Sequence, residues 1–202
     1  ARLRLKDYEV AEKDFFKVLE LNPNDIEARV NLGNLEIKRD HPRRAISYLS
    51  KAIEIKPNTY QAYDNRGLAF MDSGEPGKAV MDFKKALSIN PAHASTYNNY
   101  ALLLASYPKE EYRDGQKALE YARLACELTG WEDSIKLHML ATAYAEGGDY
   151  KQAVEWIQKA LSLVNNDDDR KDILNDLALF SEGKPYRSEI IVVDGQKPGG
   201  RD

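Results

Sequence analysis

Apolar and small residues recur along this chain at intervals of three and four positions, the spacing of a helix with one buried face. The segment NDIEARVNLGNLEIKRD, residues 24–40, carries them at Ile26, Val30, Gly33 and Ile37. The next segment, HPRRAISYLSKAIEIKP, has the same spacing. Proline and glycine, which interrupt helices, separate such segments, and no stretch before residue 188 has the pattern of a strand. The pattern therefore predicts pairs of antiparallel helices joined by tight turns.

The helix pairs repeat with a period of 34 residues, and several columns of positions keep this step. These columns are Gly33, Gly67 and Ala101; Pro23, Pro57 and Pro91; Ala11, Ala45 and Ala79; and Phe15, Leu49 and Phe83. A glycine inside a helix costs about 1 kcal/mol relative to alanine, so its recurrence indicates a place where a second helix approaches closely. We expect the small residues Gly33, Gly67, Ala101 and Ala141 to face Ala45, Ala79, Ala118 and Ala153.

This periodicity divides the chain into repeats and terminal parts. The predicted parts are a partial first repeat at 1–23, four repeats at 24–57, 58–91, 92–131 and 132–165, a capping helix at 167–182 and a tail at 183–202. The third full repeat is longer because SYPKEEYRDGQ is inserted between its helices. The capping helix is expected to cover the last repeat with Ile173, Leu174, Leu177 and Phe180, because a stack of repeats needs its open end sealed.

Three segments carry a resemblance to a known family. They are NLGNLEIKRDHPRRAISYLSKAIEIKP, NRGLAFMDSGEPGKAVMDFKKALSINP and LATAYAEGGDYKQAVEWIQKALSL, and they resemble the tetratricopeptide repeat. The last part of the chain, with RDGQKALEYARLACELTGWED, AEGGDY and GKPYR, resembles bacterial members of that family. The resemblance implies an all-α fold: a right-handed superhelical solenoid of antiparallel helix hairpins that binds other proteins. Two positions depart from the family pattern: Arg29 stands where the first helix usually has an aromatic residue, and Arg66 replaces the leucine beside Gly67.

The charge balance is mildly acidic, with 33 acidic and 29 basic residues and a formal net charge of -4. Because nucleic-acid binding proteins usually carry a basic stripe or excess, we expect no nucleic-acid partner. The longest apolar run is Ala101 to Ala105, so we expect no membrane partner. The single cysteine, Cys126, excludes an intramolecular disulfide and favours the cytoplasm, with the localisation otherwise open.

Residues with catalytic potential are scattered. His41, His93 and His138 lie far apart in the sequence, and only His138 is placed on a first helix where it could face a groove. The sequence has no HExxH, CxxC or EF-hand pattern, and GEPGKA resembles a phosphate-binding loop only in its Gly-Lys pair. We therefore expect a non-enzymatic protein with no cofactor, no catalytic residue and no metal ligand.

Stacked helix pairs place their first helices along a concave groove, where proteins of this architecture usually bind their partners. The predicted groove residues are Asn31, Asn34, Asp64, Asn65, Leu68, Asn98, Asn99, Leu102 and His138. Asn31, Asn65 and Asn99 stand 34 residues apart, and their amides can pair with the backbone of an extended peptide because an amide both donates and accepts. An ordinary polar helix face would also explain this row.

The acidic side chains predicted on the groove, Glu27, Asp64, Asp72 and Glu146, outnumber the basic Lys38. We therefore predict a protein-interaction scaffold that binds a neutral or basic segment of a partner. The alternative is a regulatory or substrate-recruiting module of a larger multidomain enzyme, which the incomplete first repeat favours. The tail segment EIIVV, residues 189–193, is either a linker or a strand-like segment that docks in the groove of the same or a neighbouring molecule.

Overall fold

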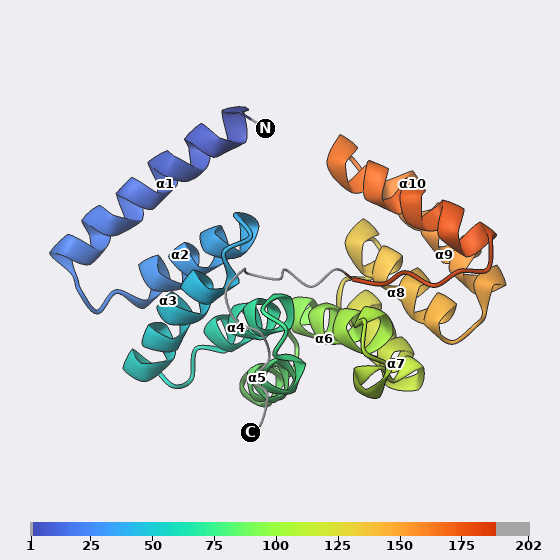
Figure 1. The fold of residues 1–202 in the computed structure, drawn as a ribbon, viewed down its shortest axis with the longest axis horizontal. Helices are drawn as coiled ribbons and strands as arrows, with labels where there is room; N and C mark the ends of the chain where they lie inside the picture. Colours follow the sequence, from blue (N-terminus) through green and yellow to red (C-terminus); the bar gives the residue numbers. More distant parts are fainter. Residues whose placement is uncertain (1, 189–202) are drawn as a thin grey trace, which may run out of the picture. The chain divides into compact units, whose positions relative to one another are not determined.

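The computed structural model describes residues 2–188, and every regular element within them is helical (Figure 1). The elements are α1 (Arg2–Leu21), α2 (Ile26–Lys38), α3 (Pro42–Ile55), α4 (Tyr60–Asp72), α5 (Pro76–Ile89), α6 (Ala94–Ser106), the 3-10 helix η1 (Glu110–Tyr112), α7 (Gly115–Leu128), α8 (Ser134–Glu146), α9 (Tyr150–Leu163) and α10 (Asp167–Ser181). They form two compact units that divide within α5, the first ending at Asp82 and the second beginning at Phe83.

Short polar side chains and prolines start these helices. Aspartate or asparagine caps accept hydrogen bonds from backbone amides of the first turn, and they are Asp25, Asp114, Asp133, Asp149 and Asn166. Each cap satisfies an amide that has no partner inside the helix. Pro42 and Pro76 open α3 and α5, where the missing amide of proline costs nothing. The predicted interruptions at RDHP, DSGEPG and EGGDY all coincide with turns between helices.

Gly33 lets α2 and α3 approach closely in the first unit. A Cβ atom added at Gly33 would lie 2.5 Å from Cγ of Leu49, whose side chain is fully buried. The predicted close approach is therefore present, but the atoms nearest to Gly33 belong to Leu49 rather than to Ala45. Leu49 and Ala45 lie one helical turn apart in the same buried cluster, with Ala52, Ala62 and Ala69.

Arg66 on α4 makes a polar contact where the family pattern has leucine. Its Nε and Nη2 atoms donate to the two carboxylate oxygens of Asp82, at 2.7 and 2.9 Å, and Nη1 donates to Oγ of Ser50 at 3.0 Å. The Asp82 side chain is 8% exposed and that of Arg66 is 19% exposed. One guanidinium thus joins α3, α4 and α5 within the first unit.

The insertion in the second unit forms an ordered turn. Tyr107 is buried, and Nη1 of Arg113 donates to the carbonyl oxygens of Tyr107 and Pro108. The backbone amide of Asp114 donates to the carbonyl of Leu104, which returns the chain to the end of α6 before α7 begins. Residues 107–114 are therefore held against the fold by hydrogen bonds and by the burial of Tyr107.

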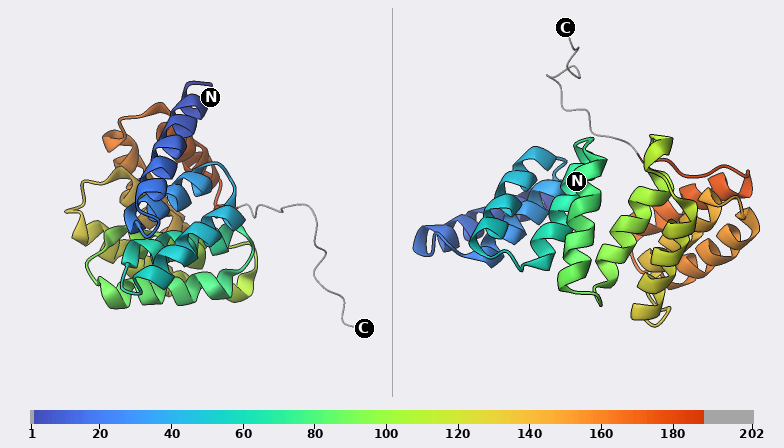
Figure 2. Two further views of the ribbon diagram at one scale, coloured as in Figure 1. Left: turned by 90° about the vertical axis from the view of Figure 1, so that its left-hand side faces the viewer. Right: turned by 90° about the horizontal axis from the view of Figure 1, so that it is seen from below.

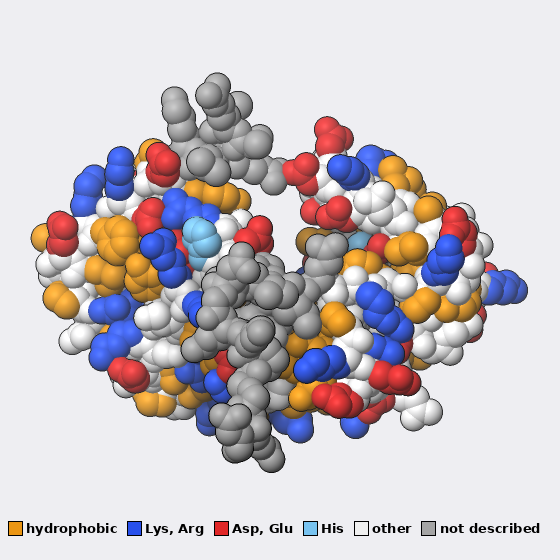
Figure 3. All heavy atoms as spheres, in the orientation of Figure 1, with side chains coloured by type: hydrophobic (Ala, Val, Ile, Leu, Met, Phe, Trp, Pro, Cys, Tyr) orange, Lys and Arg blue, Asp and Glu red, His pale blue; other side chains and the backbone are white. Residues whose placement is uncertain are grey.

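Helices α8, α9 and α10 lie side by side at the end of the second unit (Figures 1 and 2). Ile173 and Phe180 of α10 are each 1% exposed, so α10 covers α8 and α9 as expected of a capping helix. Leu174 does not take part in this contact, because it is 47% exposed. The predicted docking of residues 189–193 lies outside the described residues. On the face drawn in Figure 3, acidic and basic side chains are interspersed over both units.

Candidate functional site

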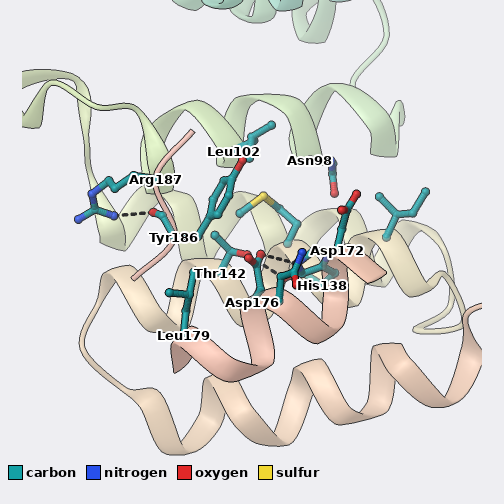
Figure 4. A pocket seen from close by; sticks show the side chains of 12 residues that line it. Asn98, Leu102, His138, Thr142, Asp172, Asp176, Leu179, Tyr186 and Arg187 are labelled. Carbon is teal, nitrogen blue, oxygen red and sulfur yellow. Dashed lines mark hydrogen bonds and ion pairs between the residues drawn. The ribbon is translucent and has the colours of Figure 1, made fainter. Parts of the chain in front are cut away.

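A pocket of about 540 Å³ lies in the second unit, between α6, α8, α10 and the non-helical residues 184–188 (Figure 4). We call residues 184–188 the docked segment. The lining combines the polar side chains of Asn98, His138, Asp172 and Asp176 with the apolar side chains of Leu102, Met139 and Leu179 and the ring of Tyr186. Its lining therefore offers an occupant both apolar contact and hydrogen-bonding groups.

Three predicted site residues meet in this pocket because α6 and α8 present equivalent positions to it. Asn98 and Leu102 are one turn apart on α6, and His138 and Thr142 are one turn apart on α8. Each pair brackets the small residue of its helix at the same spacing. Asn99 is half-buried on α6 and does not line the pocket. The equivalent position on α8 is Met139, which lines the pocket.

The amide of Asn98 is buried with an unused acceptor. Asn98 is 8% exposed, and its Oδ1 atom has no hydrogen-bond partner. In Figure 4 its side chain points into the pocket, toward Asp172 of α10. A buried polar atom without a partner costs about 1–3 kcal/mol. The unpartnered Oδ1 atom lies at the wall of the pocket, so a ligand that donates a hydrogen bond to it would remove this energetic cost.

His138 is engaged with α10. Its Nε2 atom lies 2.7 Å from Oδ2 of Asp176, which is 7% exposed. The hydroxyl of Thr142 donates to the carbonyl oxygen of His138 at 3.1 Å. The pair therefore pins α10 against α8 at the floor of the pocket. Asp172, one turn before Asp176, is exposed and leaves a negative charge at the pocket edge.

The docked segment crosses the C-terminal ends of α6 and α8. Nη1 of Arg187 lies 2.7 Å from Oε2 of Glu146, the last residue of α8. The backbone amide of Ser188 donates to the carbonyl oxygen of Ser106, the last residue of α6, at 2.9 Å. The Ser188 hydroxyl donates to the same oxygen at 3.2 Å. Tyr186 projects into the pocket between these two anchors and α10 (Figure 4).

The residues of this site that sequence reasoning missed include Asp172, Asp176, Tyr186 and Arg187. The sequence pattern places the first two only on a capping helix and the other two only in a tail. Both segments follow the last repeat, so the 34-residue period contains no information on where their side chains lie. The one available signal was the need of α10 to cover the last helix pair, which places it beside α8 without fixing its rotation.

The other predicted site residues lie in the first unit, on α2 and α4, which pack against each other. Asn31, Asn65 and Leu68 are half-buried, Asn34 is exposed and Asp64 is buried. Their role in binding stays a prediction.

Asp72, predicted as an acidic groove residue, ends α4. Burial, and to a smaller extent the nearby Asp40, raises the pKa of its carboxyl from 3.8 to about 6. Because the folded state binds this proton more tightly than the unfolded state, the stability that Asp72 contributes is complete below pH 3.8. It is lost as the pH rises through about 6.

We therefore expect Asp72→Asn to unfold like the wild type near pH 4 and to be more stable at pH 7. The difference between 3.8 and about 6 corresponds to about 3 kcal/mol at most. Denaturant titrations of both proteins at the two pH values measure it. Asp7→Asn, at an exposed position of α1, is the control. A difference between Asp72→Asn and wild type that does not change with pH would contradict the expectation.

Within residues 2–188, no cluster of three or more histidine, cysteine, aspartate or glutamate side chains is arranged to hold a metal ion. Cys126 is buried, and burial raises the pKa of its thiol to about 12, so it stays protonated at neutral pH. None of the described helices is both long and apolar enough to cross a membrane.

Several solved structures share this fold. PilF of Pseudomonas aeruginosa is 26% identical, with a TM-score of 0.64 over 78% of this chain and 68% of its own. A tetratricopeptide-repeat protein of Thermus thermophilus, TTC0263, is 20% identical, with a TM-score of 0.71 over 90% and 92%. YrrB, a protein described as having an unusual peptide-binding site, is 21% identical, with a TM-score of 0.58 over 83% and 82%. A comparison with curated proteins finds no match.

Family models of the tetratricopeptide repeat match residues 26–59, 60–93 and 137–171, together about half of the chain. The first two matches lie on α2–α3 and α4–α5, and the third begins in α8 and ends in α10. The predicted all-α helical-repeat fold is thereby confirmed. The chain belongs to the tetratricopeptide repeat family and is a protein-interaction scaffold of that fold.

Proposed function

We propose that the chain is a non-enzymatic scaffold that binds an extended segment of a partner protein along its first helices, with the pocket of the second unit as the recognition site. The observation that carries this proposal is the buried, unpartnered Oδ1 atom of Asn98 at the wall of that pocket. The peptide-binding site named for YrrB, which shares the fold, is consistent with it.

The chemistry of the pocket favours a neutral or basic segment. Oδ1 of Asn98 and the carboxylate of Asp172 are both acceptors in the pocket lining, so they suit a backbone amide or a lysine or arginine side chain. Leu102 and Met139 offer an apolar surface in the same pocket. We further propose that the amides of Asn31, Asn34, Asn65 and Asn99 pair with partner backbone, and that Asp64 and Leu68 complete the contact surface of the first unit.

We expect Asn98→Ala to weaken binding without weakening the fold. Short peptides selected from a random display library on the full chain serve as probes, and their affinity is measured by calorimetry. Loss of the acceptor should lower the affinity about tenfold, because a hydrogen bond of about 1.4 kcal/mol is lost. The free energy of unfolding should stay equal or rise by up to about 1 kcal/mol, because the unsatisfied atom is removed.

Gln158→Ala, on an exposed position of α9, removes an amide elsewhere and is the matched control. It should leave the peptide affinity unchanged. Selected peptides that bind Asn98→Ala as tightly as the wild type would refute the assignment of the pocket. A large loss of stability in Asn98→Ala would also refute it, because the amide would then serve the fold.

A further inference from the structure

The docked segment, residues 184–188, is held on the second unit by contacts of Arg187 and Ser188 with the C-terminal ends of α6 and α8. The Arg187 side chain is 36% exposed, and its approach to Glu146 is an ion pair without aligned hydrogen-bond geometry. Lys184 is exposed, and Pro185, Tyr186 and Ser188 are half-buried. The segment follows a turn at Gly183, where φ is +70°. The docked segment therefore lies beyond the last helix of the second unit and packs on its surface.

The surroundings of the Arg187 guanidinium are negatively charged and therefore favour a cation. Glu146 has a side chain that is 13% exposed and already accepts from Nε of Arg113 through Oε1 at 2.9 Å. Its second oxygen, Oε2, faces Arg187. The carbonyl ends of α6 and α8 add partial negative charge at the same place, since a helix C-terminus favours cations. Nη1 of Arg187 also reaches the carbonyl oxygen of Ala105, at 3.4 Å.

The place that Tyr186 occupies accepts an aromatic ring. Figure 4 shows the ring directed toward Leu102 of α6 and Thr142 of α8, with Leu179 of α10 below it. An aromatic side chain contributes a large contact area at a small cost in side-chain entropy. The ring fills one end of the pocket. The other end is formed by Asn98 and Asp172, and there the Oδ1 atom of Asn98 is still without a partner.

We propose, on the basis of the function proposed above, that the docked segment occupies a subsite to which the partner segment binds. The partner segment carries an aromatic residue followed directly by a basic residue, which take the places of Tyr186 and Arg187. Another part of the partner segment lies against Asp172 and Asn98, where it supplies the hydrogen-bond donor that Oδ1 lacks. Binding therefore requires the chain's own segment to leave, and this tethered segment lowers the apparent affinity for the partner.

The experiment uses the peptide GKPYRSEI, residues 183–190 of this chain, added to the full-length protein in which Tyr186→Ala and Arg187→Ala are combined. We expect the peptide to bind this variant at least tenfold more tightly than the wild type, where the chain's own segment competes. The matched control peptide GKPAASEI should bind neither protein. Fluorescence anisotropy of end-labelled peptides gives the affinities, and circular dichroism checks that the variant is folded.

If the double variant melts at a lower temperature, Arg187→Ala alone, which alters a partly exposed side chain, replaces it and should show the same direction of change. Equal binding to variant and wild type, or no binding to the variant, would overturn the inference. Library-selected peptides that depend on Asn98 but lack an aromatic–basic pair would also overturn it. That last result would leave the proposed function standing, whereas a library that selects no peptide would remove the proposed function itself.

Discussion

Gly33→Leu is expected to destabilise the first unit by about 3 kcal/mol or more, because the new side chain would overlap a packed neighbour. A Cβ at this position already meets Cγ of Leu49 at 2.5 Å and Cδ2 at 2.7 Å. Leu49 is fully buried and belongs to the core cluster with Ala45 and Ala52, so moving its side chain would disturb the packing of that cluster. Thermal and denaturant unfolding followed by circular dichroism measure the loss, which should lower the melting temperature by about 10 °C.

A second substitution tests the cause. Leu49→Ala alone should cost about 2–5 kcal/mol because it leaves a cavity, yet in Gly33→Leu it should restore part of the lost stability by making room. Gly77→Ala is the matched control, because its Cβ would have no atom within 4 Å. It should be neutral or slightly stabilising. If the effects of Gly33→Leu and Leu49→Ala simply add, then close contact between these two positions is not the reason for the glycine.

Gly33 shows which structural features a local sequence pattern predicts and which it does not. Its recurrence in register with Gly67 predicted a close helix approach, because glycine inside a helix needs a compensating gain. The partner was harder to predict: Ala45 and Leu49 are one turn apart, so both lie on the face of α3 that the pattern identifies. Which of two stacked residues is nearest depends on the offset between helices along their axes, and a 34-residue period does not encode that offset.

The residues of the candidate site show the same difference between repeated positions and segments that occur once. Asn98, Leu102 and His138 were predicted because they occupy repeated positions on first helices, and the structure places all three in one pocket. Asp176 and Arg187 were not predicted, because they belong to segments that occur once. Their positions follow from tertiary contacts, the 2.7 Å pairs with His138 and Glu146, which join residues 38 and 41 positions apart in the sequence.

Removing either partner of the Arg66–Asp82 pair is the second large effect that we expect. Asp82→Leu would leave the guanidinium with only Ser50 as a hydrogen-bonding partner, and Arg66→Leu would leave a carboxylate that is 8% exposed without a counter-charge. Breaking a buried pair in this way costs about 3–5 kcal/mol, much more than an exposed pair contributes. Chemical unfolding of each single variant measures these losses.

The double variant, Arg66→Leu with Asp82→Leu, separates the value of the pair from the cost of breaking it. Leucine is what the family pattern has beside Gly67, and replacing both charges with apolar groups removes the desolvation cost of each. We therefore expect the double variant to lie within about 1 kcal/mol of the wild type. The exposed pair Lys51–Glu54 on α3, with side chains 52% and 64% exposed, is the control, and its single variants should each cost less than about 1 kcal/mol.

A double variant as unstable as the two single variants added together would mean that Arg66 and Asp82 act independently, against the geometry of two parallel hydrogen bonds at 2.7 and 2.9 Å. If the double variant is as stable as the wild type, then the charged pair does not serve stability, and its role is to orient α4. A guanidinium fixed to α3 and α5 sets the rotation of α4 about its axis, which apolar packing constrains less sharply. That rotation decides where Asp64, Asn65 and Leu68 point. The double variant should therefore keep its stability and weaken the partner binding that is proposed for those three residues.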